Sequence, residues 1–318
     1  MDKFYPEIGI ILLNWNGRSI EFNSKSILEL SLKSLLNLNY NKLKIIVVDA
    51  SSDDDSVNWL KQFKDKITIL KAKNIGWAHN NNVGIKYILK KFKECEFIIL
   101  VSNDIIIKDK DIILKILRKI RYREDVGILG CKLINPPGSL KDPIIQNTGI
   151  RLNRYGGWSP VSHTNEGYLE RNVYVIGAFM VIRKGCFLKY GLLSGDYIKM
   201  GSEDTDFADR IYKFGYKSFY VNCEVIHIGS ISTRKTIKNK GWGKDKDKLE
   251  MYYYSNHFLY LLRYHKLKFI LFTFYNTIRI FIGIKPNIRV KTLTEINKNY
   301  KELYYELKSA IGRFNKSV

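Results

Sequence analysis

Short apolar runs alternate with longer amphipathic stretches in the part of the chain before Val126. The apolar runs are rich in β-branched residues, end in turn-forming residues and predict strands; they are Ile8–Asn14, Lys44–Ala50, Ile67–Ala72 and Phe97–Ser102. Two stretches between them place apolar residues at the i, i+3, i+4, i+7 spacing of a helix face; they are Ile85, Ile88, Leu89 and Phe92, then Ile113, Ile116, Leu117 and Ile120. This alternation predicts βαβ units in an α/β fold, with a largely parallel sheet covered by helices on both faces.

The pattern changes after Val126. Three strand-like runs follow without long helices between them, at Gly127–Ile134, Ile144–Leu152 and Val173–Arg183, and they predict a mixed extension of the sheet. The run from Arg234 to Lys248 is charged and contains glycine, which is typical of a boundary or loop. We therefore expect a main domain over residues 1–234 and a helical C-terminal region over residues 235–318.

Composition excludes several classes of protein. The 318 residues are 45% apolar and 13% aromatic, which is enough for a large core and excludes disordered, collagen-like and small disulfide-rich chains. The four widely spaced cysteines predict neither a zinc cluster nor a disulfide framework and fit a reduced, cytoplasmic compartment. The N-terminus leads straight into a strand, so we expect no signal peptide. The longest apolar stretch, Phe269–Ile284, is interrupted by Asn276 and Arg279 and predicts no transmembrane helix.

The net charge of +22 is concentrated towards the C-terminus, where residues 235–318 hold 18 Lys and Arg against 6 Asp and Glu. A positive field attracts nucleic acid, anionic lipid and phosphorylated substrates alike, so charge alone does not choose among them. Aromatic and basic residues interleave between Leu249 and Phe269. This pattern fits a membrane interface, a clamp for single-stranded nucleic acid, or a helical cap packed on the main domain.

Polar residues follow the predicted strands at the edge where α/β sheets bind ligands. The first strand ends in Asn14-Trp15-Asn16-Gly17, the second in Asp49-Ala50-Ser51-Ser52-Asp53 and the fourth in Ser102-Asn103-Asp104, while the loop Asn74–Gly84 feeds a helix. No GxGxxG or GxxxxGK[ST] motif follows a strand, which argues against nicotinamide dehydrogenases and P-loop enzymes. Taken singly, these residues could equally be turn and cap formers.

Asp204 shares a helical stripe with Phe207, Ala208 and Ile211. The spacing predicts that Asp204 faces inward and that Asp206 and Asp209 point elsewhere. A carboxylate on the buried side of a first helical turn is costly unless it is paired, capping or functional. Spacing alone leaves open whether Asp204 acts in catalysis or binds its own helix N–H groups.

Seven short motifs resemble the family 2 inverting glycosyltransferases of the GT-A fold, closest to their rhamnosyltransferase-like branch. In chain order, over roughly residues 8–233, they are NWNG, VVDASSDDDS, NIGWAHNNNVGI, VSND, VIGAFMVIRK, SEDTDFADR and VIHIGSIS. The resemblance implies a nucleotide-sugar-binding domain, a divalent metal (Mg²⁺ or Mn²⁺) and direct displacement at the anomeric carbon. It also implies a lipid-linked acceptor, which favours a membrane interface for the C-terminal region.

The resemblance assigns roles to individual residues. The nucleoside would be surrounded by Asn14, Asn16, Asp49 and Ser51, with Asp49 facing the base. Asn74, Gly76 and Asn82 would line the ribose and sugar-diphosphate channel, and Asn103 and Asp104 would complete the nucleotide-sugar set. Gly177, Ala178 and Glu203 would form the pocket for the sugar and its acceptor.

Catalysis and metal binding also follow from the resemblance. Asp204 would be the general base, and Asp104 would be the surviving metal-binding carboxylate. Ser102 and Asn103 depart from the family pattern, in which Asp or Asn and then Pro are usual; one carboxylate with water and diphosphate oxygens can still hold Mg²⁺. His227 would reach the metal or diphosphate, although a lone histidine is equally compatible with a structural role.

These assignments predict transfer of a hexose or deoxyhexose, with inversion, from a UDP- or dTDP-sugar. The acceptor would be a glycan or lipid-linked glycan in cell-surface polysaccharide synthesis, handled by a cytoplasmic protein that lies peripherally on the inner face of the cell membrane. The alternatives are a non-catalytic glycosyltransferase homologue and a basic nucleic-acid-binding protein; under the main hypothesis no nucleic acid partner is expected.

Overall fold

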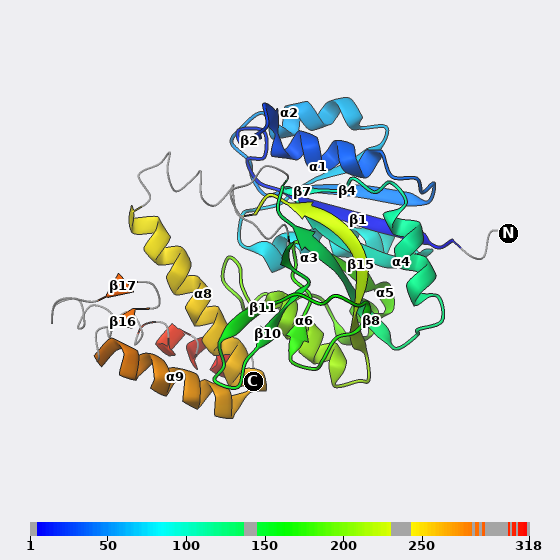
Figure 1. Cartoon of the computed structure of the whole chain (residues 1–318). Helices are drawn as coiled ribbons and strands as arrows, with labels where there is room; N and C mark the ends of the chain where they lie inside the picture. The colour runs from blue at the N-terminus through cyan, green and yellow to red at the C-terminus, as the bar shows by residue number, and fades with distance from the viewer. Residues whose placement is uncertain are drawn as a thin grey trace.

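A mixed sheet lies at the centre of the computed structural model (Figure 1). The structure describes residues 5–136, 145–229, 243–281, 284–285, 288–289, 305, 307–309 and 311–316. Within these residues, the sheet order is β12-β15-β8-β14-β6-β1-β4-β5, with β7 beside β15 and β9 beside β8. The strands are β1 (Glu7–Asn14), β4 (Leu43–Asp49), β5 (Ile67–Lys71), β6 (Cys95–Ser102), β7 (Ile105–Ile106), β8 (Val126–Ile134), β9 (Ile145–Asn147), β12 (Gly167–Tyr168), β14 (Phe179–Arg183) and β15 (Lys217–His227).

The four predicted N-terminal strands form a parallel half-sheet in the order β5-β4-β1-β6. Their register aligns Asn14 with Asp49, and Leu13 with Ser102, so that the polar strand ends meet at one edge. Next to this half, β14 runs antiparallel to both β6 and β8, while β15 is parallel to β8. The predicted mixed α/β sheet is therefore confirmed.

Two of the predicted strands are each divided. The run predicted at 144–152 contains β9 and β10 (Gly149–Leu152), and its first residue lies outside the described part. The run at 173–183 contains β13 (Val173–Tyr174) and β14. Strands β10, β13 and β11 (Trp158–Val161) form a separate small sheet, because the chain leaves the main sheet at Val175–Ala178.

Helices cover both faces of the sheet, as the apolar stripes predict. One core joins the sheet to α1 (Ile27–Leu36), α2 (Ser56–Leu60) and α4 (Ile112–Ile120). The other core joins the opposite face to α3 (Trp77–Lys91), α5 (Lys184–Tyr190) and α6 (Glu203–Tyr212). The short elements are β2 (Glu21–Phe22), β3 (Lys25–Ser26), the 3-10 helix Lys61–Phe63, β16 (Ile284–Lys285) and β17 (Ile288–Arg289).

The longest described helices of the C-terminal region are α8 (Gly243–Tyr264) and α9 (Lys266–Phe281) (Figure 1). Phe258, Leu259, Tyr260 and Leu261 of α8 are buried in the same core as α6 and the sheet, so α8 is a cap packed on the main domain. The domain boundary predicted at residue 234 lies outside the described residues and remains a prediction. Of the run 234–248, which was expected to be a boundary or loop, residues 243–248 belong to α8 and the rest lies outside the described part. No helix in the described ranges is long and apolar enough to cross a membrane.

Candidate active site

Asn14 and Asp49 meet where β1 and β4 end. Asn14 Nδ2 donates a hydrogen bond to Asp49 Oδ2 over 2.8 Å. Ser52 adds two bonds, from its hydroxyl to Asp49 Oδ2 (2.6 Å) and from its N–H to Asp49 Oδ1 (3.0 Å). Asp49 is 1% exposed, so its carboxylate already holds two loops together. That it faces a base stays a prediction. Ser52 belongs to this cluster, and the sequence analysis assigned it no role.

The exposed parts of the loops after β1 and β4 are joined as well. Asn16 and Asp53 pair through Asn16 Nδ2 to Asp53 Oδ1 (2.6 Å) and through Asp53 N–H to Asn16 Oδ1 (2.9 Å). Ser51 is exposed, and its hydroxyl donates to the Ala72 carbonyl over 2.8 Å. The four residues predicted to surround the nucleoside are thus brought to one edge of the sheet.

Asn103 continues this cluster from β6. Its Nδ2 donates to Asn14 Oδ1 over 3.0 Å. Gly17 makes the close approach possible, because a Cβ at this position would lie 2.4 Å from Asn14 Oδ1 and 2.8 Å from Asn103 Nδ2. A side chain at position 17 would separate β1 from the end of β6.

Asp104 and His227 lie together, although they are far apart in the sequence. His227 Nε2 is 3.4 Å from Asp104 Oδ2, and the Ile228 N–H donates to the Asp104 carbonyl. The amide of Gln146 donates to the His227 carbonyl and places its Oε1 2.8 Å from His227 Nδ1. We therefore assign the ring proton to Nδ1, which leaves the lone pair of Nε2 directed towards Asp104.

This pair fits a divalent cation. A carboxylate oxygen and an imidazole nitrogen are both ligands of Mn²⁺, and Mg²⁺ keeps several waters beside one or two carboxylates. The described part of the chain contains no group of three or more His, Cys, Asp or Glu residues that could hold a metal. The remaining ligands of a cation held by Asp104 and His227 would therefore be substrate oxygens and water.

Asp204 lies in the first turn of α6, half-buried. Its Oδ2 accepts the Gly177 N–H over 3.0 Å, and its Oδ1 accepts the Thr205 N–H over 2.8 Å. Burial raises the pKa of Asp204, while these backbone hydrogen bonds oppose the rise. The helix-contact alternative is thus partly realised, but only through one of the two oxygens.

Glu203 is more deeply buried than its neighbour. It is 3% exposed, and its Oε2 has no hydrogen-bond partner among the described residues. Burial, and then the charge of Asp204, raise the pKa of Glu203 to about 8. A pKa raised to this extent favours the neutral form of the carboxyl group at pH 7.

Asp206 and Asp209 are buried, contrary to the expectation that they point away from the core. The hydroxyls of Tyr197 and Tyr264 donate to Asp206, and those of Tyr174 and Tyr260 donate to Asp209. The spacing was misleading because α6 is covered on both sides, by the sheet and by α8. Phe207, Ala208 and Ile211 are buried as predicted.

The predicted channel residues have different contacts. Asn74 accepts a hydrogen bond from Lys199 through its backbone carbonyl, and Gly76 forms a β-bridge with Lys199. The amide of Asn82 binds the backbone of Leu193: its Nδ2 donates to the Leu193 carbonyl, and its Oδ1 accepts the Leu193 N–H. In the structure, Asn82 ties α3 to the loop that leads to α6.

Gly177 and Ala178 connect the two halves of the site. Gly177 donates to Asp204, and a Cβ on it would lie 2.6 Å from Trp77 Cζ2. The Ala178 carbonyl accepts the Ser102 N–H over 3.0 Å, at the end of β6 that leads to Asp104. The predicted base, Asp204, and the predicted metal residues, Asp104 and His227, therefore border the same pair of strands, β6 and β14.

Asn256 of α8 holds the loop before Asp204, and the sequence assigned it no role. Its Nδ2 donates to the carbonyls of Ile198 and Met200, and its Oδ1 accepts the Ile198 N–H. Asn256 is fully buried. The sequence signal that could have identified Asn256 is its position just before the apolar run of an aromatic-rich helix, because a polar group buried there needs hydrogen-bond partners.

Residues 21–189 match the family model of glycosyl transferase family 2. The chain belongs to this family. The matched range includes Asp49, Asp104 and Gly177, whereas Asp204 and His227 lie beyond it. None of the curated protein sequences matches the chain.

Solved structures share the GT-A glycosyltransferase fold with this family 2 chain. A Pyrobaculum calidifontis mannosyltransferase in complex with GDP-Man and Mn²⁺ has a TM-score of 0.54 at 14% identity, covering 98% of this chain and 74% of its own. GalNAc-T7 with UDP, GalNAc and Mn²⁺ scores 0.60 at 13% identity, covering 95% and 55%. S. aureus TarS 1-349 scores 0.56 at 14% identity, covering 97% and 89%.

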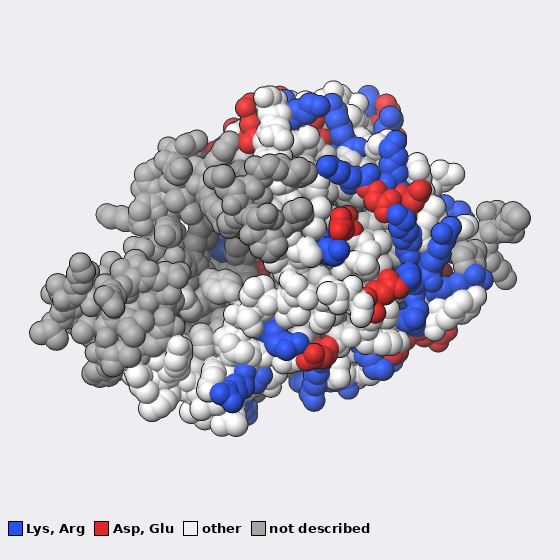
Figure 2. All heavy atoms as spheres, viewed as in Figure 1, with Lys and Arg blue, Asp and Glu red and all other residues white. Residues whose placement is uncertain are grey.

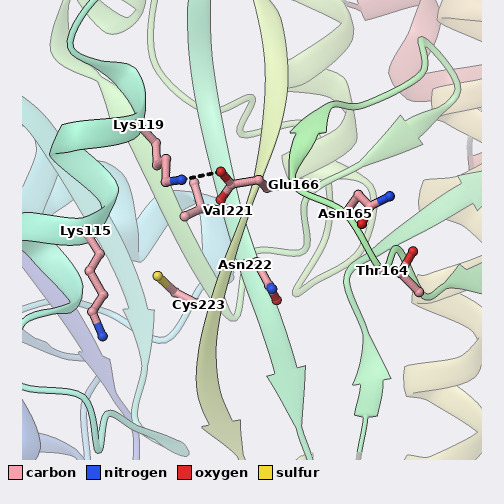
Figure 3. A pocket seen from close by; sticks show the side chains of 8 residues that line it. All are labelled: Lys115, Lys119, Thr164, Asn165, Glu166, Val221, Asn222 and Cys223. Carbon is pink, nitrogen blue, oxygen red and sulfur yellow. Dashed lines mark hydrogen bonds and ion pairs between the residues drawn. The ribbon is translucent and has the colours of Figure 1, made fainter.

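A separate surface pocket of about 450 Å³ lies between α4 and β15 (Figure 3). Lys119 crosses it to pair with Glu166, and Lys115 pairs with Asp109 at its edge. In Figure 2, Lys and Arg side chains gather on the α4 side of the molecule with Asp and Glu among them. None of the residues lining this pocket belongs to the Asp104 or Asp204 clusters.

Proposed function

We propose that the chain is an inverting glycosyltransferase that moves a hexose or deoxyhexose from a UDP- or dTDP-sugar to a glycan or lipid-linked glycan during synthesis of a cell-surface polysaccharide. One observation carries the proposal: the Asp104–His227 pair and Asp204 border the neighbouring strands β6 and β14, where β6 ends and β14 begins. A donor whose diphosphate lay beside Asp104 and His227 would direct its sugar towards Asp204. The order of the seven motifs supports placement in the rhamnosyltransferase-like branch.

Asp204 has the properties of a general base. It is half-buried and its pKa is raised, so it is a stronger base than an exposed aspartate. Asp204 takes the proton of the acceptor hydroxyl, whose oxygen bonds to the anomeric carbon as the bond to the diphosphate breaks on the opposite face. The nucleoside diphosphate leaves, and the anomeric configuration is inverted.

Asp104 and His227 are the residues that would hold a divalent cation. A cation bound there would neutralise the departing diphosphate. The presence of Mn²⁺ in two of the structural neighbours supports this cofactor, and their ligands, GDP-Man and UDP, show that guanine nucleotides should be tested beside uracil and thymine. Asn14, Asn16, Asp49 and Ser51 are proposed for the nucleoside.

We also propose that residues 1–234 form the catalytic domain and that α9, in the region 235–318, lies on the inner face of the cell membrane. Six apolar side chains form an exposed stripe on α9 at helical spacing; they are Leu267, Ile270, Leu271, Phe274, Tyr275 and Ile278. A short apolar face on a chain of net charge +22 fits the surface of an anionic bilayer.

A transfer assay tests the proposed function. Purified protein is incubated with Mn²⁺, an α-linked UDP-, dTDP- or GDP-sugar, and lipid-linked glycans. We expect release of one nucleoside diphosphate and a β-linked product, identified by NMR. A product of retained configuration would contradict the mechanism. Nucleotide-sugar binding without any transfer would favour the non-catalytic homologue, and salt-sensitive oligonucleotide binding without nucleotide-sugar binding would favour the nucleic-acid alternative.

A further inference from the structure

Two aromatic rings from distant parts of the chain pack against glycines that border Asp204. Trp77, at the start of α3, packs against Gly177, whose N–H donates to Asp204. Tyr253, from α8, packs against Gly201, three residues before Asp204. A Cβ on Gly201 would lie 3.0 Å from Tyr253 Cδ2, so the absence of a side chain allows this close approach.

Tyr253 is the more open of the two rings. It is 43% exposed, whereas Trp77 is partly buried against the core of α3 and α6. The contact of Tyr253 with Gly201 places the ring next to the loop that leads into Asp204. Burial and then the charge of Asp204 raise the pKa of Tyr253 to about 12. The ring thus borders the loop that carries Asp204 and keeps an open surface.

The ring is also held in place. Asn256, one helical turn further along α8, binds the backbone of Ile198 and Met200. The next four residues of α8, Phe258 to Leu261, are buried in the core. Tyr253 therefore projects from a fixed helix towards the loop that carries Asp204, as a preformed surface.

We propose that Tyr253 is the stacking platform for the acceptor sugar. The inference rests on the proposed function and adds the acceptor subsite to it. The C–H face of a pyranose packs on the open face of the ring, while a hydroxyl group of the same sugar reaches Asp204. Aromatic side chains suit this task because they offer a large apolar surface with a polar tip. The C-terminal region thereby contributes to acceptor binding as well as to packing.

The test is binding of a panel of methyl pyranosides, measured by saturation-transfer NMR with UDP, dTDP or GDP and Mn²⁺ present. We expect at least one pyranoside to bind the wild type. Tyr253→Ala should weaken that binding about 5- to 10-fold, the size expected for loss of one aromatic contact, and Tyr253→Phe should retain it. Tyr122→Ala, at an exposed tyrosine beside α4, is the matched control and should bind like the wild type.

Nucleotide binding, measured by calorimetry on the same samples, separates this inference from the proposed function. We expect it to be unchanged in Tyr253→Ala. Unweakened pyranoside binding in Tyr253→Ala, equal weakening in Tyr253→Phe, or nucleotide binding without binding of any pyranoside would each overturn the stacking platform alone. Failure of the wild type to bind every nucleotide tested would overturn the proposed function with it.

Discussion

Asp49 and Asp204 are both carboxylates at the edge of the central sheet, but their surroundings differ. Asp49 is buried and accepts three hydrogen bonds, from Asn14 and Ser52. Asp204 is half-buried and accepts two, both from backbone N–H groups. An ionised carboxylate offers about four acceptor positions. Asp204 therefore retains capacity on an accessible side, as proton abstraction from an acceptor hydroxyl requires.

Replacing Asp204 by Asn should remove the base and leave the donor site intact. We expect Asp204→Asn to lower kcat by about 10²- to 10⁴-fold, the usual contribution of general-base catalysis. The Kd for the nucleoside diphosphate should not change, because Asp104 and His227 are untouched. Stopped assays of nucleoside diphosphate release and calorimetry give the two values. Undiminished turnover would exclude Asp204 from this role.

Glu203 predicts a pH dependence of stability. Its pKa is about 8 in the folded protein against 4.5 as the ordinary value, so between these values the folded state holds a proton that the unfolded state has lost. Its contribution to stability is complete below pH 4.5 and is lost as the pH rises towards 8.

Glu203→Gln should therefore gain stability relative to the wild type as the pH rises from 5 to 8, by up to about 1.4 kcal/mol per pH unit. Urea unfolding at several pH values measures the free energy of unfolding of both proteins. Other titrating groups, such as His257, are shared by the two proteins, and their contributions largely cancel in the difference. A difference independent of pH would show that Glu203 is ionised in the folded protein.

Sequence reasoning at the scale of single residues worked where a strand end fixes position. The family resemblance placed Asp104 and His227 at one site, and the structure brings their side chains within 3.4 Å of each other. Sequence reasoning missed the partners of Asn82, Asp206 and Asp209, which come from other elements, while the channel role of Asn82 stays a prediction. Leu193 and the tyrosines of α8 are distant in the sequence, and no spacing within one helix reveals them.

Two elements, α6 and α8, are joined through buried polar groups. Tyr260 and Tyr264 of α8 donate to Asp209 and Asp206 of α6. Asn256 binds the loop that precedes α6. Because a buried polar group left without its partner costs about 1–3 kcal/mol, these contacts fix the angle at which α6 presents Asp204.

Asn256→Ala should accordingly reduce both stability and activity. Removal of the amide leaves the Ile198 and Met200 backbone groups unpaired, and we expect a loss of about 3 kcal/mol in the free energy of unfolding. Displacement of the loop should lower kcat about tenfold or more. Asn276→Ala is the control, since the hydrogen bond that Asn276 donates to Phe272 lies within α9. Wild-type turnover in Asn256→Ala would show that α8 does not position Asp204.

The elements themselves were largely predictable. The β-branched runs predicted the parallel half of the sheet, because a strand buried on both faces reads as a continuous apolar run. The helical stripes predicted α3 and α4, because a helix buried on one face places apolar residues at a helical period. The division of the run at 173–183 was not predictable. Val175–Ala178 are apolar or small like a strand, but they leave the main sheet to bring Gly177 to Asp204.

On the scale of the whole molecule, an exposed apolar stripe lies on α9, whereas Phe258 to Leu261 of α8 are buried. Leu267, Ile270 and Phe274 are each more than 60% exposed, in a helix that is too short to cross a bilayer. We expect the protein to bind vesicles containing phosphatidylglycerol more strongly than vesicles of phosphatidylcholine, and less strongly as salt is raised.

Ile270→Ser with Phe274→Ser should reduce this vesicle binding at least about tenfold, since each buried apolar side chain contributes about 1.5–3 kcal/mol. Soluble activity should remain, because neither residue lies near the site. Cosedimentation measures binding, and Tyr122→Ala serves as the control for an exposed apolar residue elsewhere. Binding by the double variant equal to that of the wild type would exclude α9 as the membrane surface.

The central claim is that Asp104 and His227 hold a divalent cation that binds a nucleoside diphosphate. Calorimetric titration of the protein with UDP, dTDP, GDP and ADP, each with Mn²⁺, Mg²⁺ or chelator, tests it most directly. We predict metal-dependent binding of one diphosphate, weakened about tenfold or more by Asp104→Ala and by His227→Ala. Equal binding with cation and with chelator, or an unchanged metal requirement in Asp104→Ala, would contradict the claim.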